Sequence, residues 1–202
     1  MQLYYSPGAC SLSPHIALLE AGFPVELKKV NLGIKEIEGG GNYLDVNSKG
    51  SVPALRLDNG QVLTEGPAIV QYIADLKPES GLAPKAGSME RYRLQEWLNF
   101  ITSELHKPIG SLFNKAQSPD WREAVHKNIG NKLAWLSKQL DGKTWLAGDH
   151  FSVADGYLFT VLNWTGMVGV DLAPYPALTA YQGRVAARPK VQQALRAEGL
   201  IK

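Results

Sequence analysis

The chain has 202 residues, 45% of them hydrophobic and 20% charged, with a formal net charge of +2. This composition is ordinary for a soluble globular protein, and the basic residues form no dense stripe of the kind that indicates nucleic-acid binding. No apolar run reaches the ~18 residues that a membrane span needs. One cysteine cannot form an internal disulfide, and the N-terminal residues show no signal-peptide pattern, so we expect a cytoplasmic protein.

The first 76 residues alternate between short strand and helix patterns. Glycines mark the turns and a proline stands near the start of each helix pattern, which are usual boundary signals. In chain order, the predicted elements are a strand over 2–6, a helix over 11–22, a strand over 25–32, a turn-rich segment over 33–50, a hairpin over 54–64 and a helix over 65–76.

The rest of the chain carries no strand signals. The segment 77–87, with two prolines and two glycines, is interpreted as a linker. The helices predicted beyond it span roughly 88–106, 119–140, 152–167, 177–186 and 189–197. The sequence therefore predicts an α/β domain at residues 1–80, followed by an all-α helical-bundle domain at residues 81–202.

The only cysteine, Cys10, follows the first predicted strand and stands just before a predicted helix. Free N–H groups and the helix dipole stabilise an anion at such a place, so we expect the thiol pKa to fall below ~8.5. The alternative interpretation is a small buried hydrophobe. The pattern Cys10-Ser11-Leu12-Ser13 has no second cysteine, so any disulfide must form with an external thiol.

Three places in this domain could bind parts of an acidic peptide, either its backbone or its carboxylates. A cis bond between Val52 and Pro53 would turn the Val52 backbone outward to pair with an extended peptide, whereas a trans bond makes Pro53 an ordinary edge residue. Glu65 and Gly66 open a helix whose first amides can hold a carboxylate, or whose acidic residue simply favours the dipole. Lys35 could bind an acidic ligand or be solvated.

A polar stripe follows the helix predicted over 88–106. Its lack of Lys and Glu favours a cleft wall over a solvated face, and Pro108 should kink or end the helix just beyond it. No spacing typical of a metal site and no nucleotide-binding or G-x-S-x-G motif is present. The stripe comprises Tyr92, Gln95, Asn99, Ser103 and His106.

Together these parts resemble a known family. A strand–helix–strand–helix–hairpin–helix order, with a cysteine after the first strand and a proline before the third, resembles a thioredoxin-like domain with a mixed four-stranded sheet. GSVPAL (50–55), LTEGPAIVQYIA (63–74) and, in the helical part, the capping-box segment FSVADGYLF (151–159) are similar to the glutathione transferase family. YYSPGACSLSPHI (4–16) and NFITSELHK (99–107) resemble its bacterial beta class.

The resemblance implies a homodimer that uses glutathione as co-substrate and has no prosthetic group or metal. It implies that Cys10 is the active-site cysteine and that His106 faces it. Val52, before a cis Pro53, would pair with the glutathione backbone.

The remaining positions implied by the resemblance surround the two ends of glutathione. Glu65 and Gly66 match the pair that holds the γ-glutamyl end, although many relatives carry Ser at the second position, so a hydroxyl contact is absent here. Lys35, Asn99 and Ser103 match positions near the glycine and the thiol. From position alone, the electrophile would lie against Ile109, Phe113 and Trp164.

Three functions fit these residues. The leading prediction is conjugation of reduced glutathione to hydrophobic electrophiles, in which His106 donates a hydrogen bond to the thiolate or relays its proton. The alternative is a glutathione-dependent thiol–disulfide reductase that uses Cys10. A non-enzymatic binding protein on the same scaffold predicts loss of the glutathione-binding set, and the presence of that set disfavours it.

Overall fold

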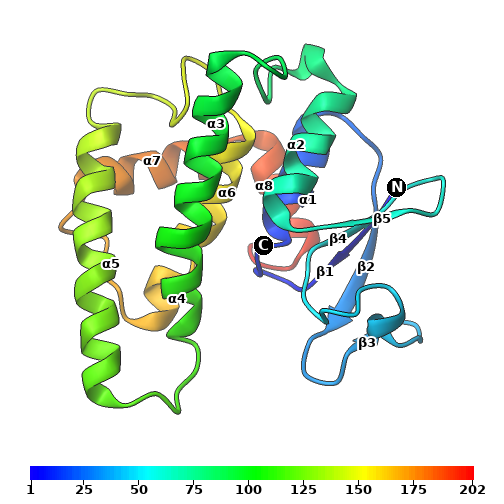
Figure 1. The fold of residues 1–202 in the computed structure, drawn as a ribbon, viewed down its shortest axis with the longest axis horizontal. Coiled ribbons are helices and arrows are strands. Elements are labelled where there is room, and N and C mark those ends of the chain that lie inside the picture. Colours follow the sequence, from blue (N-terminus) through cyan, green and yellow to red (C-terminus); the bar gives the residue numbers. More distant parts are fainter.

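Five strands form one mixed sheet in the N-terminal half of the molecule, which a computed structural model describes for all 202 residues (Figure 1). The central strand β1 lies parallel to β2 and antiparallel to β4, and its Leu3 is fully buried. In the spatial order β3-β2-β1-β4-β5, the strands are β1 (Gln2–Tyr5), β2 (Glu26–Asn31), β3 (Glu36–Ile37), β4 (Ala54–Arg56) and β5 (Val62–Thr64).

The sheet therefore has one strand more than the four predicted. The turn-rich segment 33–50 contains β3, which pairs with the end of β2, and a short 3-10 turn, η1 (Tyr43–Asp45), which Asn42 caps. A strand of two residues is too short to give an alternating pattern in the sequence, so this edge was not predicted. The mixed, thioredoxin-like arrangement of the other strands is confirmed.

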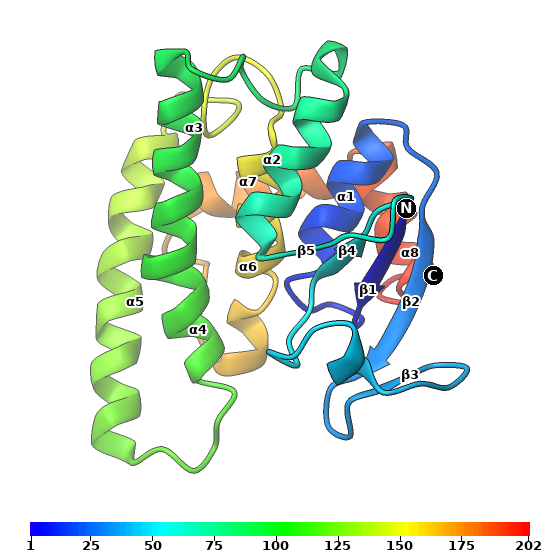
Figure 2. The same cartoon turned by 45° about the vertical axis from the view of Figure 1, so that its right-hand side comes forward.

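Two helices connect the sheet to the rest of the molecule. Helix α1 (Leu12–Glu20) packs against α2 (Gly66–Leu76) and against the helices α6 (Val153–Leu162) and α8 (Pro189–Ala197) of the C-terminal half. Figure 2 shows α1 and α2 between the strands and the long helices. One continuous apolar core runs through both halves, so the surface where they meet is held in a fixed geometry.

Eight helical segments build the C-terminal half. α6 is buried on every side, as expected for a helix that is mostly apolar all round. The predicted capping box of Ser152 and Asp155 begins it. The segments are α3 (Met89–Phe100), η3 (Ile101–His106), α4 (Lys107–Ser111), α5 (Pro119–Leu140), α6 (Val153–Leu162), η4 (Thr165–Val168), α7 (Pro176–Ala186) and α8 (Pro189–Ala197).

The long helix predicted to kink or end at Pro108 does not end there but continues to Ser111. The segment η3 is a π-helical turn, in which the Lys107 N–H donates to the Thr102 carbonyl five residues earlier. Pro108 has no N–H and would crowd the carbonyl four residues before it in an α-helix, and the wider π turn accommodates this. The helix predicted over 152–167 is shorter than expected, because α6 ends at Leu162.

The predicted linker is anchored. A short 3-10 turn, η2 (Pro78–Ser80), follows α2. Leu82 is buried, and its carbonyl accepts a hydrogen bond from the Val153 N–H at 2.9 Å. Ion pairs between Arg188 and Glu20 and between Arg91 and Asp75 also join the two halves. No helix in the structure is both long and apolar enough to cross a membrane.

Candidate active site

The loop between β1 and α1 carries Cys10 and is fixed by contacts with the helical half. The Gly8 N–H donates to a carboxylate oxygen of Glu198 at 2.9 Å, and the Gly8 carbonyl accepts from the indole N–H of Trp164 at 2.8 Å. Glu198 is itself paired with the buried His15 at 2.9 Å. The loop geometry around Cys10 thus depends on residues almost two hundred positions away.

The Cys10 thiol is protonated, contrary to the expectation of a lowered pKa. Burial raises its pKa to about 11, although the N–H groups of Cys10 and Ser11 favour the thiolate. The sulfur donates to the Val52 carbonyl at 3.1 Å, a contact that only the protonated form can make. The N–H groups of Leu12 and Ser13 already bond to carbonyls of the preceding turn, so they do not serve the sulfur. Desolvation therefore outweighs the helix start.

The bond between Val52 and Pro53 is cis, as predicted. The Val52 N–H makes no hydrogen bond within the protein, which leaves it free to pair with a ligand. The Ser51 carbonyl accepts from the Tyr43 hydroxyl at 2.8 Å and from the Asn47 amide at 2.7 Å. These two bonds fix the segment that leads to Val52.

Lys35 and Glu65 are the two non-glycine residues of the chain with a positive φ, at 58° and 70°. Backbone conformations of this kind cost free energy and are concentrated at functional sites. The Lys35 ammonium donates to the Gly50 carbonyl at 2.8 Å. Glu65 pairs with Lys49 and stands at the N-cap position of α2, where its side chain makes no cap hydrogen bond. Beside it, a Cβ at Gly66 would meet no atom within 4 Å.

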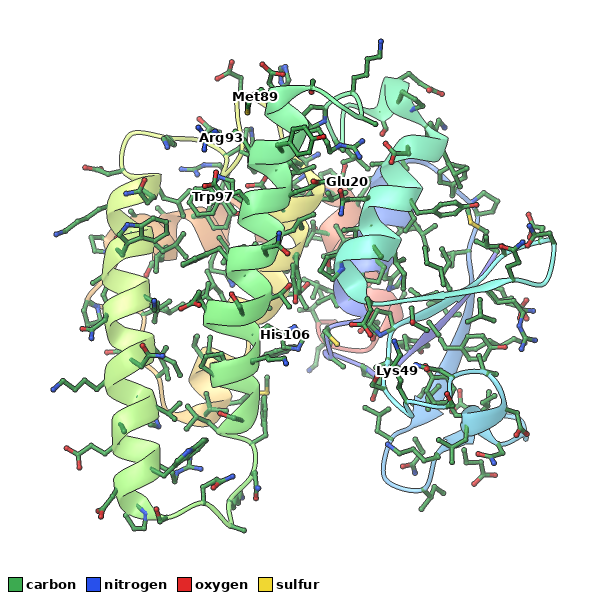
Figure 3. The ribbon with its side chains drawn as sticks, in the orientation of Figure 1. Glu20, Lys49, Met89, Arg93, Trp97 and His106 are labelled. Atoms are coloured by element: carbon green, nitrogen blue, oxygen red, sulfur yellow. The ribbon has the colours of Figure 1, made fainter.

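His106 ends the π-helical turn, and in Figure 3 its ring projects from the helical half towards the sheet half. Its Nδ1 lies 2.6 Å from the Tyr157 hydroxyl, and its ring is T-shaped against Trp164 at a centroid distance of 4.8 Å. Burial, and then the charge of Lys107, lower the pKa of His106 to about 4, although Glu65 opposes the shift. The imidazole is therefore neutral at pH 7.

A cleft of about 500 Å³ lies between these residues. Of the positions predicted from the sequence, it brings together Cys10, Lys35, Val52, His106, Phe113 and Trp164. The other lining residues are Pro7, Gly8, Ala9, Leu32, Gly50, Ser51, Gly110 and Met167. A volume of this size is in the range of small-ligand sites.

The remaining predicted positions do not line the cleft. The side chain of Ile109 has no exposed surface, so it belongs to the core, and its neighbour Gly110 faces the cleft instead. Asn99 and Ser103 are exposed on the helix surface, where the Ser103 hydroxyl donates to the Asn99 carbonyl at 3.1 Å. The π-helical turn lies between Asn99 and His106 and changes the helical phase that the predicted stripe assumed.

Pro53 precedes β4, and Glu65 and Gly66 stand at the N-terminus of α2; none of the three is among the residues that line the cleft. Tyr157 is the functional candidate that sequence reasoning missed. It belongs to a fully buried helix, and a buried tyrosine hydroxyl needs a hydrogen-bond partner, which is the signal that could have found it. No group of three or more His, Cys, Asp or Glu is placed to hold a metal ion.

The sequence matches known proteins along nearly its whole length. The family models described as the glutathione S-transferase N-terminal and C-terminal domains match residues 8–76 and 119–183. The chain is 44% identical to the glutathione S-transferase GstA of Escherichia coli O157:H7, over 99% of this chain and all of that one.

Solved structures extend the similarity. A sphingomonad glutathione S-transferase complexed with glutathione is 52% identical, and a bacterial beta class enzyme of Sphingomonas chungbukensis is 50% identical. Each covers 100% of both chains with a TM-score of 0.96. A thioredoxin-like domain joined to a helical bundle, with a cleft between them, is the architecture of two-domain transferases that use a thiol substrate. The chain belongs to the glutathione S-transferase family, and it is similar to the bacterial beta class within it.

Proposed function

We propose that this protein conjugates reduced glutathione to hydrophobic electrophiles, with glutathione as co-substrate. The observation that carries the proposal is the cleft itself. It places a backbone N–H with no partner, at Val52, and an ammonium group, on Lys35, opposite the neutral imidazole of His106.

The proposed mode of binding uses the chemistry of the ligand. Glutathione has a carboxylate at each end and a peptide backbone between them. The Val52 N–H would pair with that backbone like an added strand, and the Lys35 ammonium would meet the glycine carboxylate. At the γ-glutamyl end, Glu65 would accept from the amino group and the free Gly66 N–H would hold the carboxylate. Asn99 and Ser103 remain proposed contacts at the cleft mouth.

The helical half would supply the chemistry and hold the second substrate. A neutral His106 near the thiol would assist formation of the thiolate. Phe113 and Trp164 meet edge to face at a centroid distance of 6.2 Å and line the cleft with Met167. This apolar wall would hold a hydrophobic electrophile beside the sulfur.

Disulfide reduction by Cys10 is the second candidate, because this thiol lies in the cleft and has no resolving partner. Burial holds the pKa of the Cys10 thiol well above its ordinary value, so little of the thiol is ionised at pH 7. The thiolate is the nucleophile in disulfide exchange, so the protonated thiol disfavours this function. Conjugation needs only the thiol of glutathione.

The test is a panel of two substrates with the same preparation of enzyme. Glutathione is supplied with an aryl halide, and separately with a mixed disulfide of glutathione and a small thiol. We expect conjugation to be faster than disulfide reduction at pH 7. Reduction without detectable conjugation would contradict the proposal. Light scattering on the same sample tests the proposed homodimer, which predicts twice the mass of the chain.

A further inference from the structure

A chain of polar contacts leads from the core of the helical half to His106. The Thr102 hydroxyl donates to the Leu98 carbonyl at 2.8 Å and also lies 3.3 Å from the Tyr157 hydroxyl. The Tyr157 hydroxyl in turn lies 2.6 Å from Nδ1 of His106. Thr102 and His106 come from the π-helical turn, whereas Tyr157 comes from α6.

Counting protons along this chain fixes their positions. The Leu98 carbonyl can only accept, so the single hydroxyl proton of Thr102 is used there. The Tyr157 proton then goes either to Thr102 or to His106. If it goes to Thr102, Nδ1–H of His106 donates to Tyr157 and all three contacts are hydrogen bonds. If it goes to His106, the contact between Tyr157 and Thr102 has no proton.

Partly buried polar groups favour the arrangement with the most hydrogen bonds, which places the imidazole proton on Nδ1. Nδ1 is the ring nitrogen that has a protein partner, and the ring lines the cleft. Nε2 therefore carries the lone pair and has no partner in the protein. The tautomer of a histidine is set in this way by the bond that its other nitrogen makes.

We propose that Tyr157 is a positioning residue that holds the proton of His106 on Nδ1, so that Nε2 presents its lone pair to the thiol of glutathione. This inference rests on the proposed function and adds the direction of proton transfer to it.

The step balances as follows. Nε2 takes the proton of the glutathione S–H, and the sulfur keeps the bonding electron pair. The sulfur forms a bond to the electrophilic carbon while the leaving group departs with its own pair. The imidazolium then gives the Nε2 proton to water. Throughout, Nδ1 keeps its proton and donates it in a hydrogen bond to the Tyr157 oxygen. That oxygen supports the transient positive charge because its own hydroxyl proton is directed away from His106, in a hydrogen bond to Thr102.

The charged groups around His106 act in opposite senses on that charge. Lys107 on the same helix disfavours the imidazolium, and Glu65 at the start of α2 favours it. Cys10, before α1, is neutral, and Tyr157 on α6 stays protonated because burial raises its pKa. A bound thiolate adds a negative charge next to Nε2, so transfer is most favourable when glutathione is in place.

The kinetic test uses Tyr157→Phe, which keeps the ring and removes the hydroxyl. We expect kcat/KM for conjugation to fall about fivefold to tenfold, below the usual effect of losing the base itself. The Kd for glutathione should stay within about twofold. Thr102→Val should give a smaller loss, and the matched control Thr102→Ser should restore the wild-type rate. In a His106→Gln background, Tyr157→Phe should have no further effect, because the two residues act as one unit.

A second readout does not depend on activity. In NMR of the wild-type protein with ¹⁵N-labelled histidine, the unprotonated nitrogen of His106 should be the one that couples strongly to both ring C–H protons, which is Nε2. A proton on Nε2 would overturn the inference even if the variants failed to fold. A wild-type rate in Tyr157→Phe, with a slow His106→Gln, would overturn this inference and leave the proposed function. A wild-type rate in His106→Gln would remove the proposed catalytic role as well.

Discussion

The two walls of the cleft differ in what they present to a ligand. The sheet wall offers backbone groups and strained loop positions, such as the Val52 N–H and the positive φ of Lys35. The helical wall offers side-chain rings, those of His106, Phe113 and Trp164. The difference indicates that changes in the sheet wall should act on the affinity for glutathione, whereas changes in the helical wall should act on rate and on the choice of electrophile.

One side chain on each wall, Cys10 and His106, has a pKa that burial shifts, and the two shifts run in opposite directions. Burial raises the pKa of the Cys10 thiol and lowers the pKa of the His106 imidazole. In both groups the low-dielectric surroundings disfavour the charged form. The ligand-free cleft therefore holds a neutral thiol and a neutral imidazole, and no ion pair between them.

The largest expected effect is on the stability of the helical half, which carries the helical wall. The Asp155 carboxylate accepts from the Leu146 N–H, from the N–H and hydroxyl of Ser152 and from the Tyr181 hydroxyl, all at 2.8 Å. Asp155→Ala leaves these buried donors unpaired, so we expect a loss of about 3 kcal/mol or more in the free energy of unfolding. Ser152→Ala removes only the cap hydroxyl and should cost about 1 kcal/mol. Equal losses in urea titrations would contradict this ranking.

The next effect concerns pH and the helical wall. The pKa of His106 is lower in the folded protein than in the unfolded chain, so the unfolded chain gains a proton first as the pH falls. The shift therefore leaves the free energy of unfolding unchanged above the ordinary pKa of ~6.5 and lowers it as the pH falls from that value to about 4. At pH 4.5, the wild type should have lost about 2 kcal/mol more than His106→Gln relative to pH 7. Parallel stability curves for the two proteins would show that His106 is not held neutral.

A smaller effect is expected on the sheet wall. Lys35→Met removes the ammonium group at the cleft, so the KM for glutathione should rise about fivefold while kcat stays nearly constant. Lys85→Met, at an exposed position of the linker, is the matched control and should leave both parameters unchanged. A fall in kcat without a change in KM for Lys35→Met would contradict the assignment of glutathione affinity to the sheet wall.

The last prediction concerns the reactivity of Cys10 itself, which should be low. Alkylation of this thiol in the ligand-free protein should be slow at pH 7 and should keep rising up to about pH 11, because burial holds it protonated. Mass spectrometry of the intact protein after quenching measures this rate, and Cys10→Ala supplies the blank. A plateau at or below pH ~8.5, the ordinary thiol value, would contradict a desolvated thiol and revive the reductase hypothesis.

Patterns of local origin predicted much of this molecule. The helix predicted over 119–140 is α5 with the same ends, and the capping box at Ser152 and Asp155 appears as expected. The residues alone leave the cis bond before Pro53 open, and the family resemblance implies it. The exact boundary between the domains at residues 80 and 81 stays a prediction.

What could not be predicted depends on contacts between distant residues. The raised thiol pKa of Cys10 follows from its desolvation in the folded chain, where the sulfur lies against the Val52 carbonyl 42 positions away, and no helix-start rule contains that contact. The π-helical turn changes the helical phase along this segment, in which Ile109 is buried and Asn99 and Ser103 are exposed. The bond between His106 and Tyr157 joins positions 51 residues apart, so only the folded structure brings it together.

The central claim is that His106, and not Cys10, assists the thiol of glutathione. It is tested most directly by kcat for conjugation at pH 7, measured side by side for His106→Gln and Cys10→Ala at saturating glutathione. We predict a fall of about tenfold or more for His106→Gln and a clearly smaller one for Cys10→Ala, with both proteins folded. The reverse order, with Cys10→Ala nearly inactive and His106→Gln close to wild type, would contradict the account.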